Sequence, residues 1–328
     1  MAEFVPHPWF KNGHAQTLAG NFQPRKNLLP RGEVRLFNVE QDAQILCHCH
    51  WQKEDRERRL TLIIVHGLEG SSDSRYVIGT GSKAWQRGMN VVRMNMRNCG
   101  GTEQLTPTLY HSGMSQDVGA VVRTLIEEDR LQQIAVAGFS MGGNLVLKIT
   151  GEWGKDAPRE VKSAIGISPA IDLAVSADTL HAKQNRLYEW KFMRGLRARI
   201  RRKAKLFPNR YDLRYLHGLR TIREFDDQIT ARYSGFTGAD DYYARAASAN
   251  VIDKIAVPTL VIHAEDDPFI KLTAESRKKL ESNPNVTFIE TSHGGHCAFM
   301  AKPDGDGGDG RWAEMRLVIF AAEHADGM

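Results

Sequence analysis

The sequence predicts an α/β protein whose mostly parallel β-sheet is covered by helices on both faces. Strand and helix patterns alternate along most of the 328 residues, as they do where helical crossovers join parallel strands. Expected strands such as residues 60–65 and 133–137 are continuous apolar runs, which is typical of strands buried on both faces. The third observation is a strand, a G-x-S-x-G turn and a helix in direct succession at residues 133–148.

The other elements are assigned from the period of their apolar residues. Residues 33–51 contain two strand patterns, which predict an antiparallel pair at one edge of the sheet. Helical patterns follow at residues 75–87 and 114–128, and a last one at 311–324 predicts an amphipathic closing helix. Further strands are expected at residues 60–66, 89–96, 161–168, 257–264 and 285–290.

Ser140 is the central residue of the G-x-S-x-G turn at residues 138–142. In a nucleophile elbow, small neighbours let the chain double back sharply and leave the serine Oγ exposed. A glycine-rich turn with an incidental serine also fits these five residues. The strand before the turn and the helix after it favour the elbow. This succession predicts that Ser140 is a nucleophile and that the architecture is the α/β-hydrolase fold.

A serine nucleophile needs a base and an acid that orients the base, and in α/β-hydrolases these follow in the order Ser, Asp or Glu, His. Asp266 and Asp267 come directly after one expected strand, and His293 and His296 come after the next. We predict Asp267 as the acid because it precedes a proline, which leaves Asp266 as a loop carboxylate. We predict His296 as the base because its Gly-Gly-His setting leaves room for the ring to reach the serine. His293 is then a supporting loop histidine.

The oxyanion hole of this fold uses the backbone N–H after the nucleophile and one N–H from the loop after the third strand. Met141 supplies the first of these amides. The turn that follows the strand at residues 60–66 places Leu68 to supply the second. His66, in the same turn, is interpreted as a structural loop histidine rather than a catalytic base.

A long stretch with helical patterns and no convincing strand separates the expected strands at 161–168 and 257–264. A cap over the pocket is commonly inserted at this point of α/β-hydrolases. The chain length fits one domain with an insertion better than two unrelated domains. We therefore predict a single domain over residues 1–328 with a helical cap insertion at approximately residues 174–250.

Residues 191–205, within this insertion, are strongly basic and contain no acidic residue. Phe192, Leu196 and Ile200 recur at a spacing of four, so one face of the expected helix is apolar. Either the basic face is solvated, or it contacts an anionic membrane or an acidic partner. Because the excess positive charge is concentrated here, the net charge of +5 gives no independent support for nucleic-acid binding, and no nucleic-acid partner is expected.

The start of the chain, its apolar stretches and its cysteines indicate the cellular location. The start of the chain lacks the basic and apolar regions of a secretory signal, and no apolar stretch is long enough to span a membrane. The four cysteines, Cys47, Cys49, Cys99 and Cys297, show no disulfide framework, so a cytoplasmic location is expected.

Two segments resemble metal sites without fitting one. Cysteines and histidines alternate at residues 47–50, so on a strand they face opposite sides. The acidic segment at residues 304–309 lacks the glycine and the distal glutamate of a calcium loop, and we interpret it as a turn. No metal is expected.

Several motifs resemble those of the YheT-type α/β-hydrolases over nearly the whole chain. They are the G-H-x-Q-T opening at residues 13–17 with its neighbours His7-Pro8-Trp9-Phe10 and Arg25, the segment 66–74 that begins His-Gly-Leu-Glu-Gly, and the segments 96–101 and 110–113. The resemblance implies a hydrolase of carboxylic esters, related to eukaryotic abhydrolase-domain lipases that act on acylglycerols or phospholipids. By position, it also implies Ser140, Asp267 and His296 as the charge-relay set.

The sequence thus predicts a serine hydrolase that cleaves a small-molecule or lipid ester through an acyl-enzyme, without a metal or an organic cofactor. Either a short-chain carboxylesterase or an acylglycerol lipase would fit. Three alternatives stay open. The same triad could serve an acyltransferase, with an alcohol or a thiol replacing water, or a peptidase or amidase. The scaffold could also belong to a non-catalytic binding protein.

Overall fold

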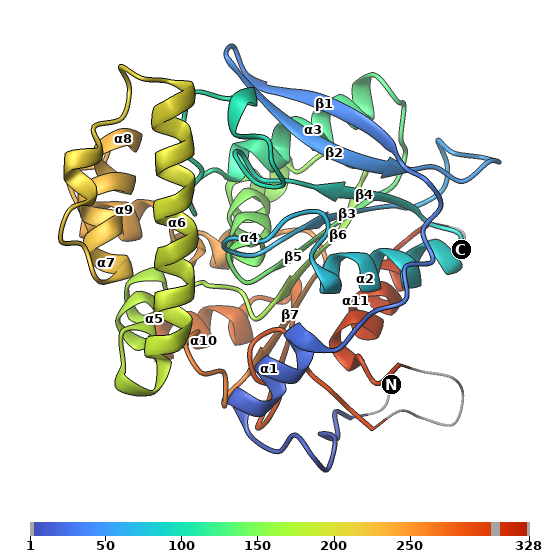
Figure 1. Ribbon diagram of the computed structural model, residues 1–328. Helices are drawn as coiled ribbons and strands as arrows, with labels where there is room; N and C mark the ends of the chain where they lie inside the picture. Colours follow the sequence, from blue (N-terminus) through green and yellow to red (C-terminus); the bar gives the residue numbers. More distant parts are fainter. Residues whose placement is uncertain (1–2, 303–308, 327–328) are drawn as a thin grey trace.

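One β-sheet runs through the computed structural model, which describes residues 3–302 and 309–326 (Figure 1). Its eight strands are β1 (Glu33–Glu40), β2 (Ala43–His50), β3 (Thr61–Val65), β4 (Asn90–Met94), β5 (Ile134–Phe139), β6 (Val161–Ile167), β7 (Thr259–Ala264) and β8 (Val286–Thr291). The spatial order is β1-β2-β4-β3-β5-β6-β7-β8, with β1, β2 and β4 paired antiparallel and all other pairs parallel. The predicted α/β class, every predicted strand and the antiparallel edge pair are confirmed.

Helices cover both faces of the sheet, as predicted (Figure 1). The helices outside the segment between β6 and β7 are α1 (Gly13–Phe22), α2 (Arg75–Gln86), α3 (Ser115–Glu127), α4 (Met141–Trp153), α10 (Ala274–Ser282) and α11 (Trp312–Glu323). Helices α2 and α11 pack together on one face, and α3 and α4 pack together on the other. Sequence analysis did not predict α1 or α10.

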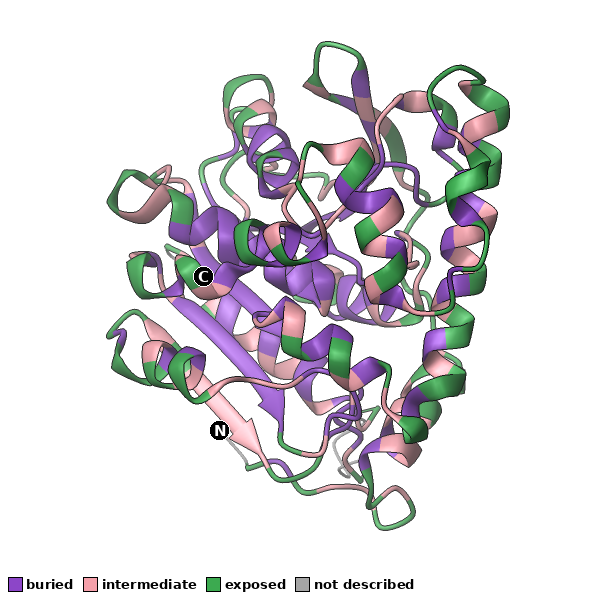
Figure 2. Ribbon diagram, turned by 90° about the vertical axis from the view of Figure 1, so that its left-hand side faces the viewer, coloured by how far each residue is buried: buried purple, intermediate pink, exposed green. Residues whose placement is uncertain are grey.

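Alternate residues of the central strands build two separate cores. In β3, Leu62 and Ile64 belong to the core under α2 and α11, whereas Ile63 and Val65 belong to the core under α3 and α4. This period of two explains why the strand is apolar throughout, because both of its faces are covered. Figure 2 shows the buried central strands and, at one edge, the only partly buried β8.

The segment between β6 and β7 consists of helices joined by loops and forms the left-hand part of Figure 1. Its helices are α5 (Leu173–Leu180), α6 (Arg186–Leu206), α7 (Ile222–Phe225), α8 (Arg232–Ser234) and α9 (Ala239–Ala246), with a π-helical turn at Asp226–Ala231. Short 3-10 turns lie here at Lys183–Asn185, Leu213–Leu216, Ser248–Asn250 and Ile252–Lys254, and elsewhere at Glu103–Leu105 and Gly154–Asp156. That this insertion acts as a cap within a single domain stays a prediction.

Helix α6 places part of the basic segment at residues 191–205 inside the protein. Arg199 and Lys203 are buried, and each donates hydrogen bonds to acceptors inside the protein. The Arg199 Nε donates to Glu69 at 2.9 Å, and the Lys203 ammonium donates to the carbonyl of Glu103 at 3.0 Å. The apolar face was predicted correctly, since Leu196 and Ile200 are buried.

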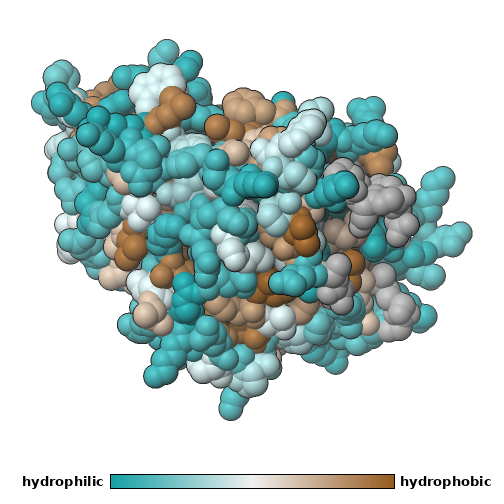
Figure 3. Space-filling view, turned by 90° about the horizontal axis from the view of Figure 1, so that it is seen from below, coloured by the Kyte–Doolittle hydropathy of each residue, from teal (hydrophilic) through white to brown (hydrophobic). Residues whose placement is uncertain are grey.

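No helix in the described chain combines the length and the apolar character that crossing a membrane requires. On the face seen in Figure 3, apolar side chains form separate patches among hydrophilic ones. The turn expected at residues 304–309 lies, apart from its last residue, outside the described residues.

Candidate active site

Ser140 occupies a strained turn between β5 and α4. Its backbone has φ 54° and ψ −119°, a region that residues with a side chain rarely adopt. The two glycines of the motif are required by close packing. A Cβ on Gly138 would lie 2.2 Å from the carbonyl oxygen of Gly142, and one on Gly142 would lie 2.4 Å from that of His66. The predicted sharp turn is therefore present, and it turns Ser140 toward a cavity.

The structure brings His296 and Asp267 together. The His296 Nδ1 lies 2.7 Å from an Asp267 carboxylate oxygen, and Asp267 is fully buried. The other carboxylate oxygen of Asp267 accepts the amides of Phe269 at 3.1 Å and Ile270 at 2.9 Å. These two hydrogen bonds restrict the orientation of the carboxylate, whose other oxygen contacts the imidazole.

The neighbouring acid and histidine form a second, outer pair. The His293 Nδ1 lies 3.3 Å from Asp266, and both side chains are more exposed than the inner pair. Asp266 also accepts the amide of Gly295 at 2.8 Å. Asp266 thus holds the loop that carries His296, which agrees with the loop role inferred from the sequence.

Ile167 and Cys297 connect the Ser140 turn with His296. The carbonyl of Ile167 accepts the Ser140 amide at 2.9 Å, and the Cys297 sulfur lies 3.7 Å from that same oxygen. The Cys297 sulfur is also 3.7 Å from the His296 Nε2. Among the described residues, no hydrogen bond joins Ser140 to His296. Such bonds are often long before substrate binds.

Helix α1 holds the histidine loop and was missed by the sequence reasoning, which used its motif only as a resemblance. The Thr17 hydroxyl accepts the His296 amide at 2.9 Å. Gln16 is buried and accepts the Met300 amide at 2.7 Å. Gly13 packs so tightly that a Cβ there would lie 1.8 Å from the carbonyl oxygen of Asp266. These contacts give the G-H-x-Q-T motif a structural function beside the site.

Leu68 and Met141 line the same cavity as Ser140. Within the described residues, neither backbone amide donates a hydrogen bond to the protein, whereas the neighbouring Gly67 amide donates to the Tyr76 hydroxyl at 2.9 Å. Two free donors beside a strained serine are what an oxyanion hole requires.

His66 is fully buried, and both of its ring nitrogens form hydrogen bonds with the backbone. Its Nδ1 bonds the Gly67 carbonyl at 2.7 Å, and its Nε2 accepts the Met96 amide at 3.1 Å. Burial lowers the pKa of His66 to about 4, so the ring is neutral.

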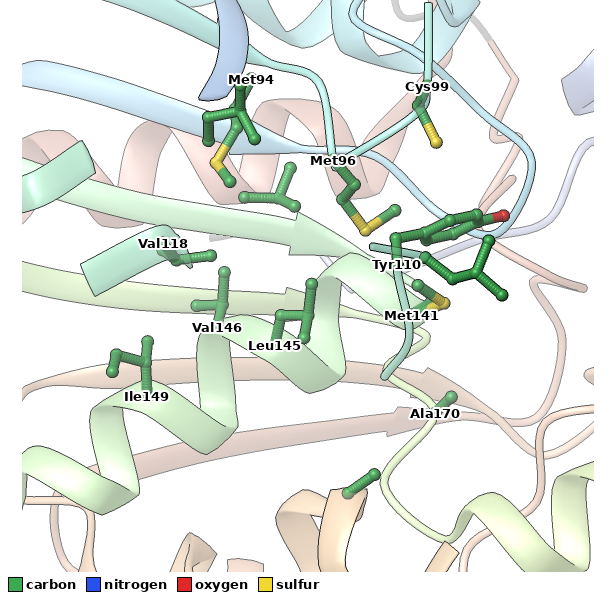
Figure 4. Packing of buried hydrophobic residues seen from close by; sticks show 14 of the residues in the cluster. Met94, Met96, Cys99, Tyr110, Val118, Met141, Leu145, Val146, Ile149 and Ala170 are labelled. Atoms are coloured by element: carbon green, nitrogen blue, oxygen red, sulfur yellow. The ribbon is translucent and has the colours of Figure 1, made fainter. Parts of the chain in front are cut away.

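The cavity beside Ser140 contains about 960 Å³ of space between protein atoms, part of it open to solvent, and is predominantly apolar. Figure 4 shows Tyr110, Met141 and Ala170 gathered near the ends of the sheet strands, where this cavity begins. Side chains of the helical insertion form much of the remaining wall, among them Leu173, Leu196, Ile200, Phe225 and Tyr243.

Comparison with known proteins identifies the family. The family model described as the alpha/beta hydrolase fold matches residues 61–303. The chain belongs to this family. YheT of Escherichia coli (strain K12), named as a candidate esterase, is 34% identical over 91% of this chain and 87% of its own. The human protein named phospholipase ABHD3 is 26% identical over 90% of this chain and 73% of its own. The structure of Est1E from Butyrivibrio proteoclasticus with ferulic acid matches with a TM-score of 0.56 and 18% identity, covering 88% of this chain and 98% of that one.

The electrostatics of this alpha/beta hydrolase couple the charges of His296 and Asp267. Burial alone would lower the pKa of His296, but the Asp267 carboxylate, together with the Cys297 side chain, raises it from 6.5 to about 10. Burial alone would raise the pKa of Asp267, but His296 and the Ile270 amide lower it instead. Asp267 is therefore ionised and His296 is a stronger base than a free imidazole.

Within residues 3–302 and 309–326, no group of three or more His, Cys, Asp or Glu side chains is arranged to hold a metal ion. Cys47 and Cys49 are buried in the core beneath the sheet, as the alternation along β2 predicts.

Proposed function

We propose that this alpha/beta hydrolase cleaves carboxylic esters with Ser140 as nucleophile, His296 as base and Asp267 as the acid that orients the base. Family membership and relatives named as esterase and phospholipase support an ester hydrolase in general. The observation that carries the finer proposal is the 2.7 Å contact between His296 and the fully buried Asp267, together with the strained turn that holds Ser140.

The proposed reaction has two steps. His296 accepts the Ser140 proton at Nε2 while Oγ attacks the ester carbonyl, and Asp267 stabilises the imidazolium that forms. The free amides of Leu68 and Met141 stabilise the tetrahedral oxyanion, an effect of about 3 kcal/mol per donor in other enzymes. The protonated His296 then gives its proton to the leaving alcohol, and water, activated in the same way, releases the acid.

The cavity supports an ester with a sizeable apolar part. Its wall is mostly aliphatic and aromatic, so an acyl chain would be stabilised there by about 0.8 kcal/mol for each buried methylene. We propose that the insertion at residues 174–250 is a cap, because its side chains close the cavity on the side away from the sheet.

Turnover of p-nitrophenyl esters with acyl chains from two to sixteen carbons tests this function. We expect hydrolysis with an optimum at medium or longer chains, because the apolar wall continues well beyond Ser140. A fluorophosphonate probe should label Ser140 in the same preparation. Labelling without turnover of any ester would favour a different acyl substrate or acceptor. Absence of both labelling and turnover would contradict the proposal and favour a binding protein.

We propose, in addition, that the outer face of α6 contacts an anionic membrane surface. Arg194 and Arg201 are exposed there beside Trp190 and Leu187, whose exposed fractions are 57% and 69%. Arginines flanking exposed apolar side chains are the composition of interfacial helices. Such a contact would place the cap, and with it the cavity, at a lipid surface.

The variant Arg194→Glu/Arg201→Glu tests the membrane proposal. Each basic residue near an anionic surface contributes roughly 1 kcal/mol, so binding to vesicles of phosphatidylcholine and phosphatidylglycerol should weaken at least about tenfold. Arg202 is left unchanged because it pairs with Glu103. The control Lys53→Glu/Arg58→Glu changes exposed charges on the loop between β2 and β3. Equal vesicle binding by wild type and both variants would contradict the proposal.

A further inference from the structure

The wall of the cavity formed by the insertion carries one carboxylate, Asp226, among apolar side chains. Asp226 begins the π-helical turn Asp226–Ala231, and such turns are rare and frequent at functional sites. Thr230 donates to one carboxylate oxygen at 2.7 Å, and Tyr243 donates to the other at 2.8 Å. Thr230 and Tyr243 also line the cavity, so the three residues form a small polar area in its apolar wall.

Asp226 has no cationic partner within salt-bridge distance among the described residues. The nearest basic residue along the chain, Arg223, pairs with Asp178 at 2.9 Å and with Asp240, and its charge lowers the pKa of Asp226 without a direct ion pair between the two. Arg199, which also lines the cavity, is paired with Glu69 at 2.9 Å. The one cavity-lining histidine, His111, has its pKa lowered to about 4 by burial and is neutral.

Asp226 as a whole residue is half-buried, and it lines the cavity. Burial raises its pKa to about 6, which leaves it mainly ionised at neutral pH. A carboxylate without a directly paired cation in apolar surroundings is costly unless further donors reach it. Two donors come from the protein, and a carboxylate has lone pairs for further donors.

A second polar group lies on the same wall. Ser176, on α5, lines the cavity, and its hydroxyl is buried without a hydrogen-bond partner among the described residues. Buried hydroxyls are normally satisfied, so an unpartnered one on a cavity-lining residue points to a polar group of a ligand. Ser176 and Asp226 come from different helices, which makes the two observations independent.

We propose that Asp226 is a specificity-determining residue that binds a hydrogen-bond donor of the substrate, a hydroxyl or an ammonium group, remote from the ester that Ser140 attacks. This inference rests on the proposed ester hydrolase function. The substrate is then an ester with an apolar segment between its reacting carbonyl and a donor group, rather than a plain alkyl ester. The apolar wall would bind the segment, and Asp226 would select for the terminal group.

The test compares p-nitrophenyl esters of eight, ten and twelve carbons whose acyl chains end in a methyl, a hydroxyl or an ammonium group. At one chain length or more, wild type should have a kcat/KM for a hydroxyl or ammonium ester that exceeds that of the methyl ester. In Asp226→Asn the ratio of kcat/KM for the donor ester to kcat/KM for the methyl ester should fall by at least about tenfold. The control Asp240→Asn removes an exposed carboxylate that contacts Arg223 outside the cavity and should keep the preference.

The outcomes separate the two proposals. If wild type hydrolyses methyl esters but prefers neither donor group at any length, the role of Asp226 is refuted while the esterase function stands. If Asp226→Asn slows all esters equally, Asp226 is structural only. A preference for the ammonium ester identifies a cationic substrate group, and a preference for the hydroxyl ester identifies a neutral one. Should Asp226→Asn fail to fold, the wild-type comparison alone still decides.

Discussion

Replacement of Ser140 by alanine is expected to lower kcat for ester hydrolysis by roughly 10⁴-fold or more, with the fold retained. The change removes only the hydroxyl oxygen, and the strained backbone is held by the close packing of Gly138 and Gly142 rather than by the serine side chain. The measurement is steady-state hydrolysis of p-nitrophenyl butyrate and octanoate by wild type and variant. Circular dichroism and Tm should be nearly unchanged.

Two comparisons make this result specific to Ser140. The control Ser282→Ala removes an exposed hydroxyl at the end of α10 and should leave kcat unchanged. A fluorophosphonate probe should label wild type and Ser282→Ala but not Ser140→Ala. Residual activity of a tenth of wild type or more in Ser140→Ala would place the nucleophile elsewhere.

Asp267→Asn is expected to lower kcat by about 10⁴-fold, and Asp266→Asn is expected to lower it far less. An asparagine amide can donate to the His296 Nδ1, which would favour the tautomer whose Nε2 carries the proton and cannot act as a base. The two adjacent acids form a matched pair, since each faces a histidine nitrogen, at 2.7 Å for Asp267 and 3.3 Å for Asp266. The opposite ranking in kcat would exchange the two assignments.

The dependence of kcat/KM on pH gives a second readout for the same variant. The base must be neutral to accept the serine proton, so activity should rise as pH increases through the pKa of His296. Because Asp267 raises that pKa, the acidic limb of the wild-type profile should lie above pH 6.5. Without the carboxylate charge, the residual activity of Asp267→Asn should show a limb at lower pH. A limb that does not move would contradict the coupling between the two residues.

Much of the candidate site could be predicted because its residues lie next to recognisable local patterns. Ser140 sits between a strand and a helix, and the pairs Asp266–Asp267 and His293–His296 follow strands directly. The carboxyl ends of neighbouring parallel strands meet at one edge of a sheet, so such residues are brought together by the topology alone. Asp267 was preferred over Asp266 because it precedes a proline, and His296 was preferred over His293 because it follows two glycines.

The function of α1 could not be predicted in this way. Its residues contact the histidine loop from a part of the chain separated from it by nearly the whole sequence, as in the bond from the His296 amide to Thr17. The helix is short, and no alternation or period connects it to the sheet. Asp226 was missed for a similar reason, because only the folded insertion places it in the wall that faces Ser140.

The sequence by itself determined the α/β class, the strand order along the chain, the strained turn at Ser140 and the short set of acids and histidines that could serve it. These follow from period, apolar runs and glycine positions, which are local properties of the chain. The tertiary structure alone decided that Arg199 and Lys203 of a basic helix turn inward, that α1 contacts the histidine loop, and that Asp226 lines the cavity. Those outcomes depend on contacts between residues that are far apart in the sequence. Such contacts form only when the chain packs, so no local pattern predicts them.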